Sequence, residues 1–291
     1  MHVLVGLPAP VPHAPASLEL LRRIAFPEAR LDLVHAMPPP IPVGWPAEVV
    51  VAAETLLWHT DADGARLLTS LGELADRNRD LGPMDAALLD GSAADVLIDR
   101  AEESNCDLIA IDASRKGALE RRIAGSTAQS IVIGSRKSVL VARPARHPGP
   151  LKVVFATDHS PFAERCAHLL ARMAPKGMAS ITVASAWSES RFATIDSLAG
   201  SQAIPPSQAF REALVRRNEM TERVFEPVAL HTTSVLVPDE PNAAIQRVVE
   251  ETGADLLVVG ARGHGFVERL ALGSVSLHQV LHSTASVLVL R

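Results

Sequence analysis

The amino-acid sequence predicts an α/β fold made of two tandem, doubly wound domains, each with a parallel sheet between layers of helices. Short apolar segments that suit buried strands alternate with segments of helical spacing along the chain, which is typical of parallel α/β sheets. The length of 291 residues also suits two domains. Hydrophobic residues make up 47% of the chain, enough for a core in each half.

A long internal repeat divides the chain. The segment NCDLIAIDASRKGALERRIAGSTAQSIVIGSRKSVLVARP at 105–144 aligns with GADLLVVGARGHGFVERLALGSVSLHQVLHSTASVLVLR at 253–291. The matched pairs, each 148 residues apart, are Asp107 with Asp255, Gly117 with Gly265, Gly125 with Gly273 and Ser126 with Ser274. We therefore expect one domain over residues 1–145 and a second over 151–291, because the segment between the repeats, RPARHPGP, carries three prolines and a glycine.

Each half is expected to contain the same elements in the same order. A first strand leads into a helix, and Ser160 and Pro161 suit the N-cap and first position of that helix in the second half. A second strand and a variable segment follow. A helix, a strand, a helix, a strand, a glycine-rich loop, a helix and a last strand complete the half. The early elements are expected at Val3–Leu7, 17–25 and Leu31–Ala36, and again at Val153–Thr157, 161–173 and Ile181–Ala186.

The last strand of each half is apolar at nearly every position. These strands are Ser138–Ala142 (SVLVA) and Ser286–Leu290 (SVLVL). A strand of this kind needs cover on both faces. We therefore expect the two domains to pack on each other, with the last strands at or near the contact.

Composition excludes several classes of protein. The net charge is −5 and no long basic stripe is present, so nucleic acid is not an expected partner. No apolar run is long enough to cross a bilayer, and the N-terminus suits a strand better than a signal peptide. A cytoplasmic location follows. Cys106 and Cys166 lie far apart without a CxxC motif, so we expect buried, reduced thiols and no metal site.

The segment LLVVGARGHGFVERLALGSVS, residues 256–276, carries the most information about function. Its apolar run stops at Gly260, Gly263 follows, and Gly273 and Ser274 precede a segment of helical spacing. A strand, a glycine-rich turn and a helix start form a phosphate-binding arrangement, because glycines let the backbone approach an anion and the helix start offers free N–H groups. The alternative is a glycine-rich turn that holds no ligand.

The spacing Gly-x-x-Gly-x9-Gly-Ser differs from the Walker pattern and from the dinucleotide fingerprint. It resembles the nucleotide loop of the ATP-binding branch of the universal stress protein family. The order of elements over almost the whole chain is similar to two tandem domains of that family. The resemblance implies five-stranded, adenine nucleotide alpha hydrolase-like sandwiches. It also implies a stress-response regulatory protein that binds ATP or another adenine nucleotide, with Mg²⁺ left open.

The same resemblance implies roles for individual residues of the second half. Asp158, at the tip of the first strand, would face the nucleoside and accept hydrogen bonds from it, although an Asp there also suits a helix N-cap. The other implied contacts are Ala156 and Thr157 beside the base, Ala186 at the adenine, Gly260 and Gly263 near the ribose and phosphates, Arg262 screening phosphate charge, and Gly273, Ser274, Val275 and Ser276 at the phosphates.

The first half departs from this pattern. Asp112 stands where the second half has Gly260, Arg115 stands where it has Gly263, and the first strand ends in GLPAP without an acid. A carboxylate at Asp112 would repel phosphate. We therefore expect nucleotide in the second domain alone, while a small anion at Gly125 and Ser126 stays open.

No catalytic constellation is recognisable in the sequence. The chain has no Walker lysine and no Ser-His-Asp order, so a nucleotide-binding regulator is favoured over a dedicated enzyme, with slow ATP hydrolysis left open. A different class is a nucleotide-independent adaptor or scaffold, in which domain pairing within the chain, or a homodimer, presents a surface to a partner.

Overall fold

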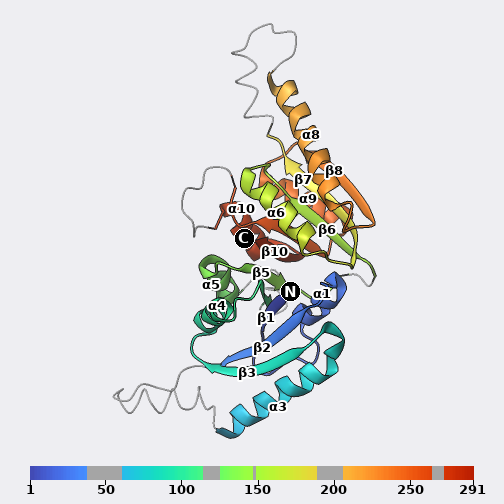
Figure 1. Ribbon diagram of the computed structural model, residues 1–291. Coiled ribbons are helices and arrows are strands. Elements are labelled where there is room, and N and C mark those ends of the chain that lie inside the picture. Colours follow the sequence, from blue (N-terminus) through green and yellow to red (C-terminus); the bar gives the residue numbers. More distant parts are fainter. Residues whose placement is uncertain (38–60, 114–124, 147–148, 189–205, 264–271) are drawn as a thin grey trace, which may run out of the picture.

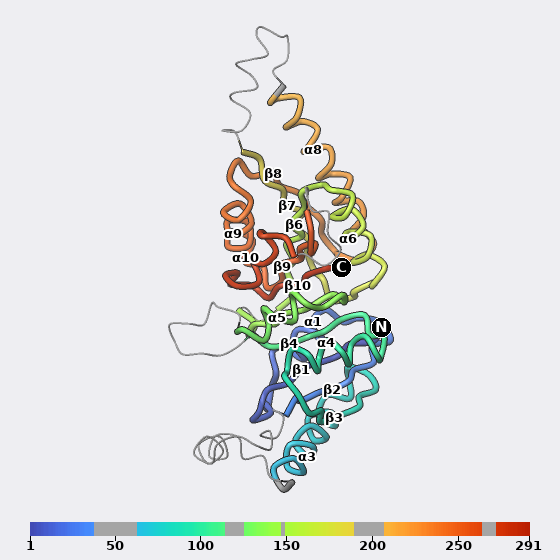
Figure 2. Tube along the Cα trace, turned by 90° about the vertical axis from the view of Figure 1, so that its left-hand side faces the viewer, coloured from blue at the N-terminus to red at the C-terminus, as the bar shows by residue number. Residues whose placement is uncertain are grey.

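The computed structural model describes residues 1–37, 61–113, 125–146, 149–188, 206–263 and 272–291. Within these residues the strands form one ten-stranded sheet in the order β3-β2-β1-β4-β5-β10-β9-β6-β7-β8 (Figure 1). The two halves of the chain are stacked end to end, and β5 and β10 lie between them (Figures 1 and 2). The α/β class expected from the sequence is confirmed.

The elements alternate between strand and helix in both halves. In the first half they are β1 His2–Gly6, α1 Ala16–Ile24, β2 Arg30–Met37, α3 Asp61–Arg77, a 3-10 turn at Arg79–Leu81, β3 Met84–Asp90, α4 Ala93–Glu103, β4 Leu108–Asp112, α5 Ser126–Gly134 and β5 Ser138–Ala142. In the second half they are β6 Leu151–Ala156, α6 Pro161–Arg172, β7 Met178–Ala186, α8 Pro206–Phe225, β8 His231–Val237, α9 Pro241–Thr252, β9 Leu256–Gly260, α10 Ser274–His282 and β10 Ser286–Leu290.

Each half is a doubly wound parallel sheet. In the first half β1 pairs in parallel with β2 on one side and β4 on the other. In the second half β6 pairs in the same way with β7 and β9. Connections therefore leave these central strands towards opposite edges of the sheet, which is the switch point where ligands of such folds bind.

The helices cover both faces of the sheet, and the apolar side chains between them form two clusters. One cluster packs α1, α3, α6 and α8 on one face, and the other packs α4, α5, α9 and α10 on the opposite face. Figure 2 shows α9 and α10 on one side of the second-half strands and α6 and α8 on the other. Each cluster includes residues of both halves, so the core is continuous across the join.

The halves are joined by the last strands, as the sequence predicted. β5 and β10 pair antiparallel, with Leu140 opposite Leu288 and Val139 opposite Val289. Leu140 and Leu288 are counterparts in the repeat, so a pseudo-twofold axis passes between them. All four side chains are fully buried.

Two arginines that follow these strands reinforce the join reciprocally. Arg143 Nη2 donates to the carbonyl of Val280 at 2.7 Å, and Arg291 Nη2 donates to the carbonyl of Val132 at 2.5 Å. Arg143 and Arg291 are counterparts in the repeat, and so are Val132 and Val280. Burial lowers the pKa of Arg143 to about 10, which still leaves its guanidinium charged at neutral pH. Each arginine thus ties its own half to the last helix of the other.

A second contact between the halves requires a glycine. The amides of Lys176 and Gly177, in the turn before β7, donate to the carbonyls of Ala25 and Ile24 at the end of α1. A Cβ atom at Gly177 would lie 1.7 Å from the carbonyl oxygen of Arg23. No larger residue fits this turn unless the two halves move apart.

We therefore expect Gly177→Ala to lower the free energy of unfolding by about 2–3 kcal/mol, because the added methyl breaks the amide contacts of the turn. Chemical denaturation measures this. Gly72→Ala is the matched control: a Cβ there meets nothing within 4 Å, so the change should stabilise α3 by about 0.5–1 kcal/mol. Equal stability of Gly177→Ala and the wild type would show that the contact contributes nothing.

Candidate functional site

The tip of β6 and the loop after β9 meet at the carboxyl edge of the second-half sheet. Asp158 is exposed, and its Oδ1 accepts a hydrogen bond from the Ser160 amide at 3.0 Å. A Cβ atom at Gly263 would lie 2.5 Å from Asp158 Oδ2. The structure therefore brings together two residues that the sequence assigned to one site from positions 105 residues apart.

Position 263 requires a glycine because of the space around it and not because of its backbone conformation. Its φ lies outside the left-handed region, so its backbone conformation alone does not require a glycine. The space that a side chain would fill is already occupied by the Asp158 carboxylate. A substitution at Gly263 would therefore displace Asp158 as well as alter the loop.

The helix cap of α6 belongs to Ser160 and not to Asp158. The Ser160 hydroxyl accepts from the Ala163 amide at 3.1 Å, and Pro161 follows at the first helical position, as expected. Asp158 supports this turn through its bond to the Ser160 amide. The rest of its carboxylate faces the loop that carries Gly263.

Three other residues assigned to the nucleoside lie at the same edge. Ala156 and Ala186 are the half-buried last residues of β6 and β7. Thr157 is buried, and its hydroxyl accepts from the His159 amide at 2.9 Å. Thr157 therefore shapes the loop that presents Asp158.

The start of α10 leaves backbone donors unpaired within the helix. Gly273 is the N-cap, and the first intrahelical bond runs from the Leu277 amide to the Gly273 carbonyl at 2.9 Å. The amides of Ser274, Val275 and Ser276 therefore have no acceptor inside the helix. Ser274 is exposed, so its hydroxyl can join these amides at an anion.

The hydroxyl of Ser276 is bonded within the protein, whereas its amide stays available at the start of α10. Its side chain is buried, and its hydroxyl donates to the Gly260 carbonyl at 2.6 Å. This hydrogen bond holds the start of α10 against the end of β9, so the hydroxyl proton is not available to a ligand. Among the assigned residues, Ser276 is a positioning residue.

Gly260 also has a structural reason to be a glycine. A Cβ atom there would lie 3.2 Å from two atoms of the Phe162 ring. The guanidinium groups of Arg262 and Arg165 lie 5.3 and 5.4 Å from the centre of that ring, within the range of a cation–π contact. Gly260 lets the ring approach β9, and the ring in turn holds Arg262 beside the glycine loop.

His159 also belongs to this region, and no motif in the sequence points to it. It is buried with φ of 55°, and its Nε2 lies 2.9 Å from Asn218 Oδ1 on α8. Its carbonyl accepts from Arg217 Nη1 at 3.1 Å. These bonds anchor the loop that presents Asp158 to the adjacent helix.

The equivalent region of the first half is built differently. Asp112, the counterpart of Gly260, accepts the amides of Ala16 at 3.0 Å and Ser17 at 2.8 Å. Its carboxylate therefore caps the start of α1. Arg115 and Gly117 lie outside the described residues.

Comparison with known protein families identifies the chain. The model of the universal stress protein family matches residues 1–143 and again residues 151–291. The chain belongs to the universal stress protein family. A universal stress protein of Thermus aquaticus, from the QAH/OAS sulfhydrylase 3' region, is 39% identical over 87 residues, which is 28% of this chain and 64% of that relative's length.

Solved structures support the fold of this universal stress protein over its whole length. One from Archaeoglobus fulgidus covers 100% of this chain and 98% of its own, with a TM-score of 0.63 and 15% identity. A putative one from Pseudomonas aeruginosa covers 99% of this chain and 92% of its own, with a TM-score of 0.62 and 16% identity. These likenesses support the fold alone.

Three further observations concern metals, membranes and the cysteines. Within the described residues, no group of three or more His, Cys, Asp or Glu side chains could hold a metal ion. No helix among those residues is long and apolar enough to cross a membrane. Both cysteines are free and buried, and burial raises the pKa of Cys106 to about 11 and of Cys166 to about 12.

We expect the stability of the protein to fall as the pH falls below about 6.5, the ordinary pKa of an unfolded histidine. Burial lowers the pKa of His159 in the folded state, against the opposing effect of Asn218. The unfolded chain therefore takes up the proton first. Denaturation between pH 7.5 and 5.5 should give a shallower decline for His159→Gln, whereas Gln in place of the exposed His168 should keep the wild-type slope. Parallel profiles for the wild type and His159→Gln would contradict this.

Proposed function

We propose that this protein is a stress-response regulator whose second domain binds an adenine nucleotide, with ATP as the first candidate. The observation that carries the proposal is the approach of the exposed Asp158 carboxylate to Gly263, on the loop that leads to the free amides of α10. The carboxylate suits the nucleoside end of a nucleotide, and the amides suit its phosphates. Both lie at the switch point where ligands of such folds bind.

The charges at the two ends would orient the ligand. A carboxylate accepts hydrogen bonds from ribose hydroxyls or an adenine amino group and repels phosphate. The amides of Ser274, Val275 and Ser276, with the Ser274 hydroxyl, would receive the phosphates. Arg262 beside the Phe162 ring would add positive charge, and Mg²⁺ would arrive with the phosphates.

Binding is proposed for one half of the chain. The first half has no acid at the tip of β1, and Asp112 on β4 adds a negative charge close to where the second half has only glycine. One nucleotide per chain follows. Because no catalytic group beside the phosphates is identified among the described residues, the proposed role is binding, with any hydrolysis slow.

Calorimetric titration with Mg-ATP should give a stoichiometry near one for the wild type. Ser274→Pro is the sharpest variant, because it deletes one amide at the first helical position, where proline is tolerated, and Gly273 before it is already extended with ψ of 146°. Loss of a hydrogen bond to a charged group should weaken ATP about tenfold or more. Asp158→Asn should also weaken ATP while keeping the bond to the Ser160 amide.

Ser126→Pro, at the same position of α5, is the matched control and should leave ATP affinity unchanged. A stoichiometry of two, or weakening by Ser126→Pro but not by Ser274→Pro, would contradict the site. No binding of any adenine nucleotide to the wild type would favour the nucleotide-independent adaptor.

A further inference from the structure

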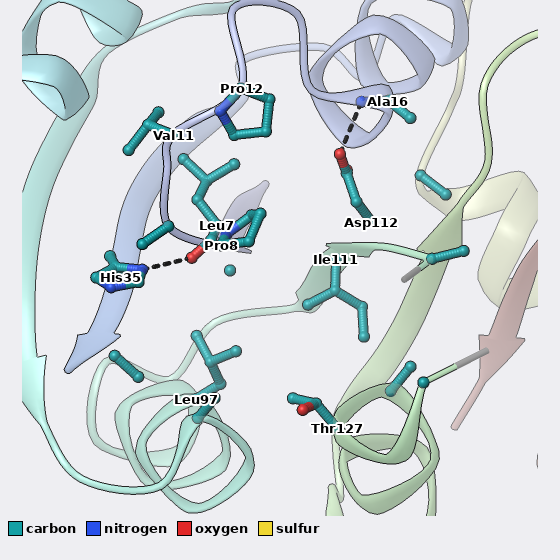
Figure 3. Close-up of a pocket in the computed structure, with 18 of the residues that line it drawn as sticks. Leu7, Pro8, Val11, Pro12, Ala16, His35, Leu97, Ile111, Asp112 and Thr127 are labelled. Atoms are coloured by element: carbon teal, nitrogen blue, oxygen red, sulfur yellow. Dashed lines mark hydrogen bonds between the residues drawn. The ribbon is translucent and has the colours of Figure 1, made fainter. Parts of the chain in front are cut away.

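A cavity of about 740 Å³ lies at the carboxyl edge of the first-half sheet, at the ends of β1, β2, β4 and β5 (Figure 3). Its volume is within the range of pockets that bury small molecules. Most of its described wall is apolar, and the larger apolar side chains that line it include Leu7, Pro8, Val11, Pro12, Leu97 and Ile111.

The connection between β1 and α1 forms one wall of this cavity. It spans residues 7–15, whereas the equivalent connection in the second half spans only residues 157–160. Prolines at positions 8, 10, 12 and 15 stiffen this connection and have no backbone N–H. This wall therefore presents few hydrogen-bond donors that a ligand would have to pair. The first-half cavity therefore suits a ligand with an apolar body.

The ionisable side chains among the described lining residues are Asp112 and His35, and these residues include no lysine or arginine. Both oxygens of Asp112 accept amides of α1, and Figure 3 shows the side chain directed towards Ala16 and away from Thr127. His35 Nδ1 donates to the Leu7 carbonyl at 2.8 Å, and its buried Nε2 has no hydrogen-bond partner among the described residues.

The start of α5 is the electropositive part of the wall. Gly125 is the N-cap, and the first intrahelical bond is from the Gln129 amide to the Gly125 carbonyl at 3.1 Å. The amides of Ser126, Thr127 and Ala128, which line the cavity, have no acceptor within the helix. A helix start corresponds to roughly half a positive charge.

We propose that the first-half cavity binds an apolar monocarboxylate, with its carboxylate on the amides of α5 and its hydrocarbon body against the proline-rich wall. One helix start can balance a single negative charge. A triphosphate would bring several negative charges beside Asp112, with no lysine or arginine among the described lining residues to offset them. This inference does not depend on nucleotide binding in the second half.

Calorimetric titration of the full chain with decanoate, below its critical micelle concentration, tests the proposal. Saturable binding with a stoichiometry near one is expected. Decanol, which has the same body without the charge, should bind at least tenfold more weakly. Comparable binding of decanol would mean non-specific apolar association only and would overturn the proposal, as would the absence of saturable decanoate binding.

Paired variants locate the ligand. Ser126→Pro should weaken decanoate about tenfold or more, since Gly125 is extended with ψ of 165° and accepts a following proline. Ser274→Pro should leave decanoate affinity unchanged. Ala36→Phe, at the cavity end of β2, should abolish decanoate binding by filling the cavity, whereas Ala186→Phe at the counterpart position should not.

The two proposals fail in different ways. If ATP does not bind but decanoate does, and Ser126→Pro weakens it, the nucleotide proposal fails and the carboxylate site stands. If ATP displaces decanoate from the wild type and from Ser274→Pro, the first-half cavity is a nucleotide site and the carboxylate proposal is overturned. Decanoate affinity that is unaffected by both Ser126→Pro and Ala36→Phe would also overturn it.

Discussion

The antiparallel pairing of β5 with β10 is the constraint on which the rest of the molecule depends. Each half alone would end in a largely apolar strand with an open edge, which is a site for aggregation. Pairing the two strands closes both edges and makes one continuous core. Because this pairing is antiparallel, the parallel strands of the two halves run in opposite directions. The carboxyl ends of the first-half strands therefore lie on the opposite side of the molecule from those of the second half. The site at Asp158 and the first-half cavity are therefore separate, and one ligand cannot bridge them.

The two halves solve the same packing problem with different residues. In the second half Gly260 lets the ring of Phe162, second residue of α6, approach the end of β9. In the first half the second residue of α1 is Ser17, and Asp112 reaches its amide instead. The second half thus has an acid, Asp158, after its first strand, whereas the first half has an acid, Asp112, at the end of its fourth strand. A small set of substitutions thus changes the polarity of the edge while the fold is kept.

Much of this architecture follows from the sequence, because strand composition and the repeat are local signals. The order of elements, the place of the last strands and the Ser160 cap were predictable, as was the approach of Asp158 to the glycine loop. The bond from Ser276 to Gly260, the His159–Asn218 contact and the tie from Arg143 to Val280 were not. Each depends on where distant segments meet. The first-half cavity was missed for a related reason: the degenerate glycine loop indicated loss of a site, but the proline-rich connection that shapes the cavity has no counterpart in the second half.

Amide hydrogen exchange on the native protein tests most directly whether the join holds the two halves as one unit. The amides of β5 and β10 that pair with each other should exchange only by global unfolding, at the same free energy as the central strands β1 and β6. Exchange of Val139, Val141, Val287 and Val289 through a lower-energy opening, with β1 and β6 still protected, would contradict the account. The halves would then be stable domains that merely touch.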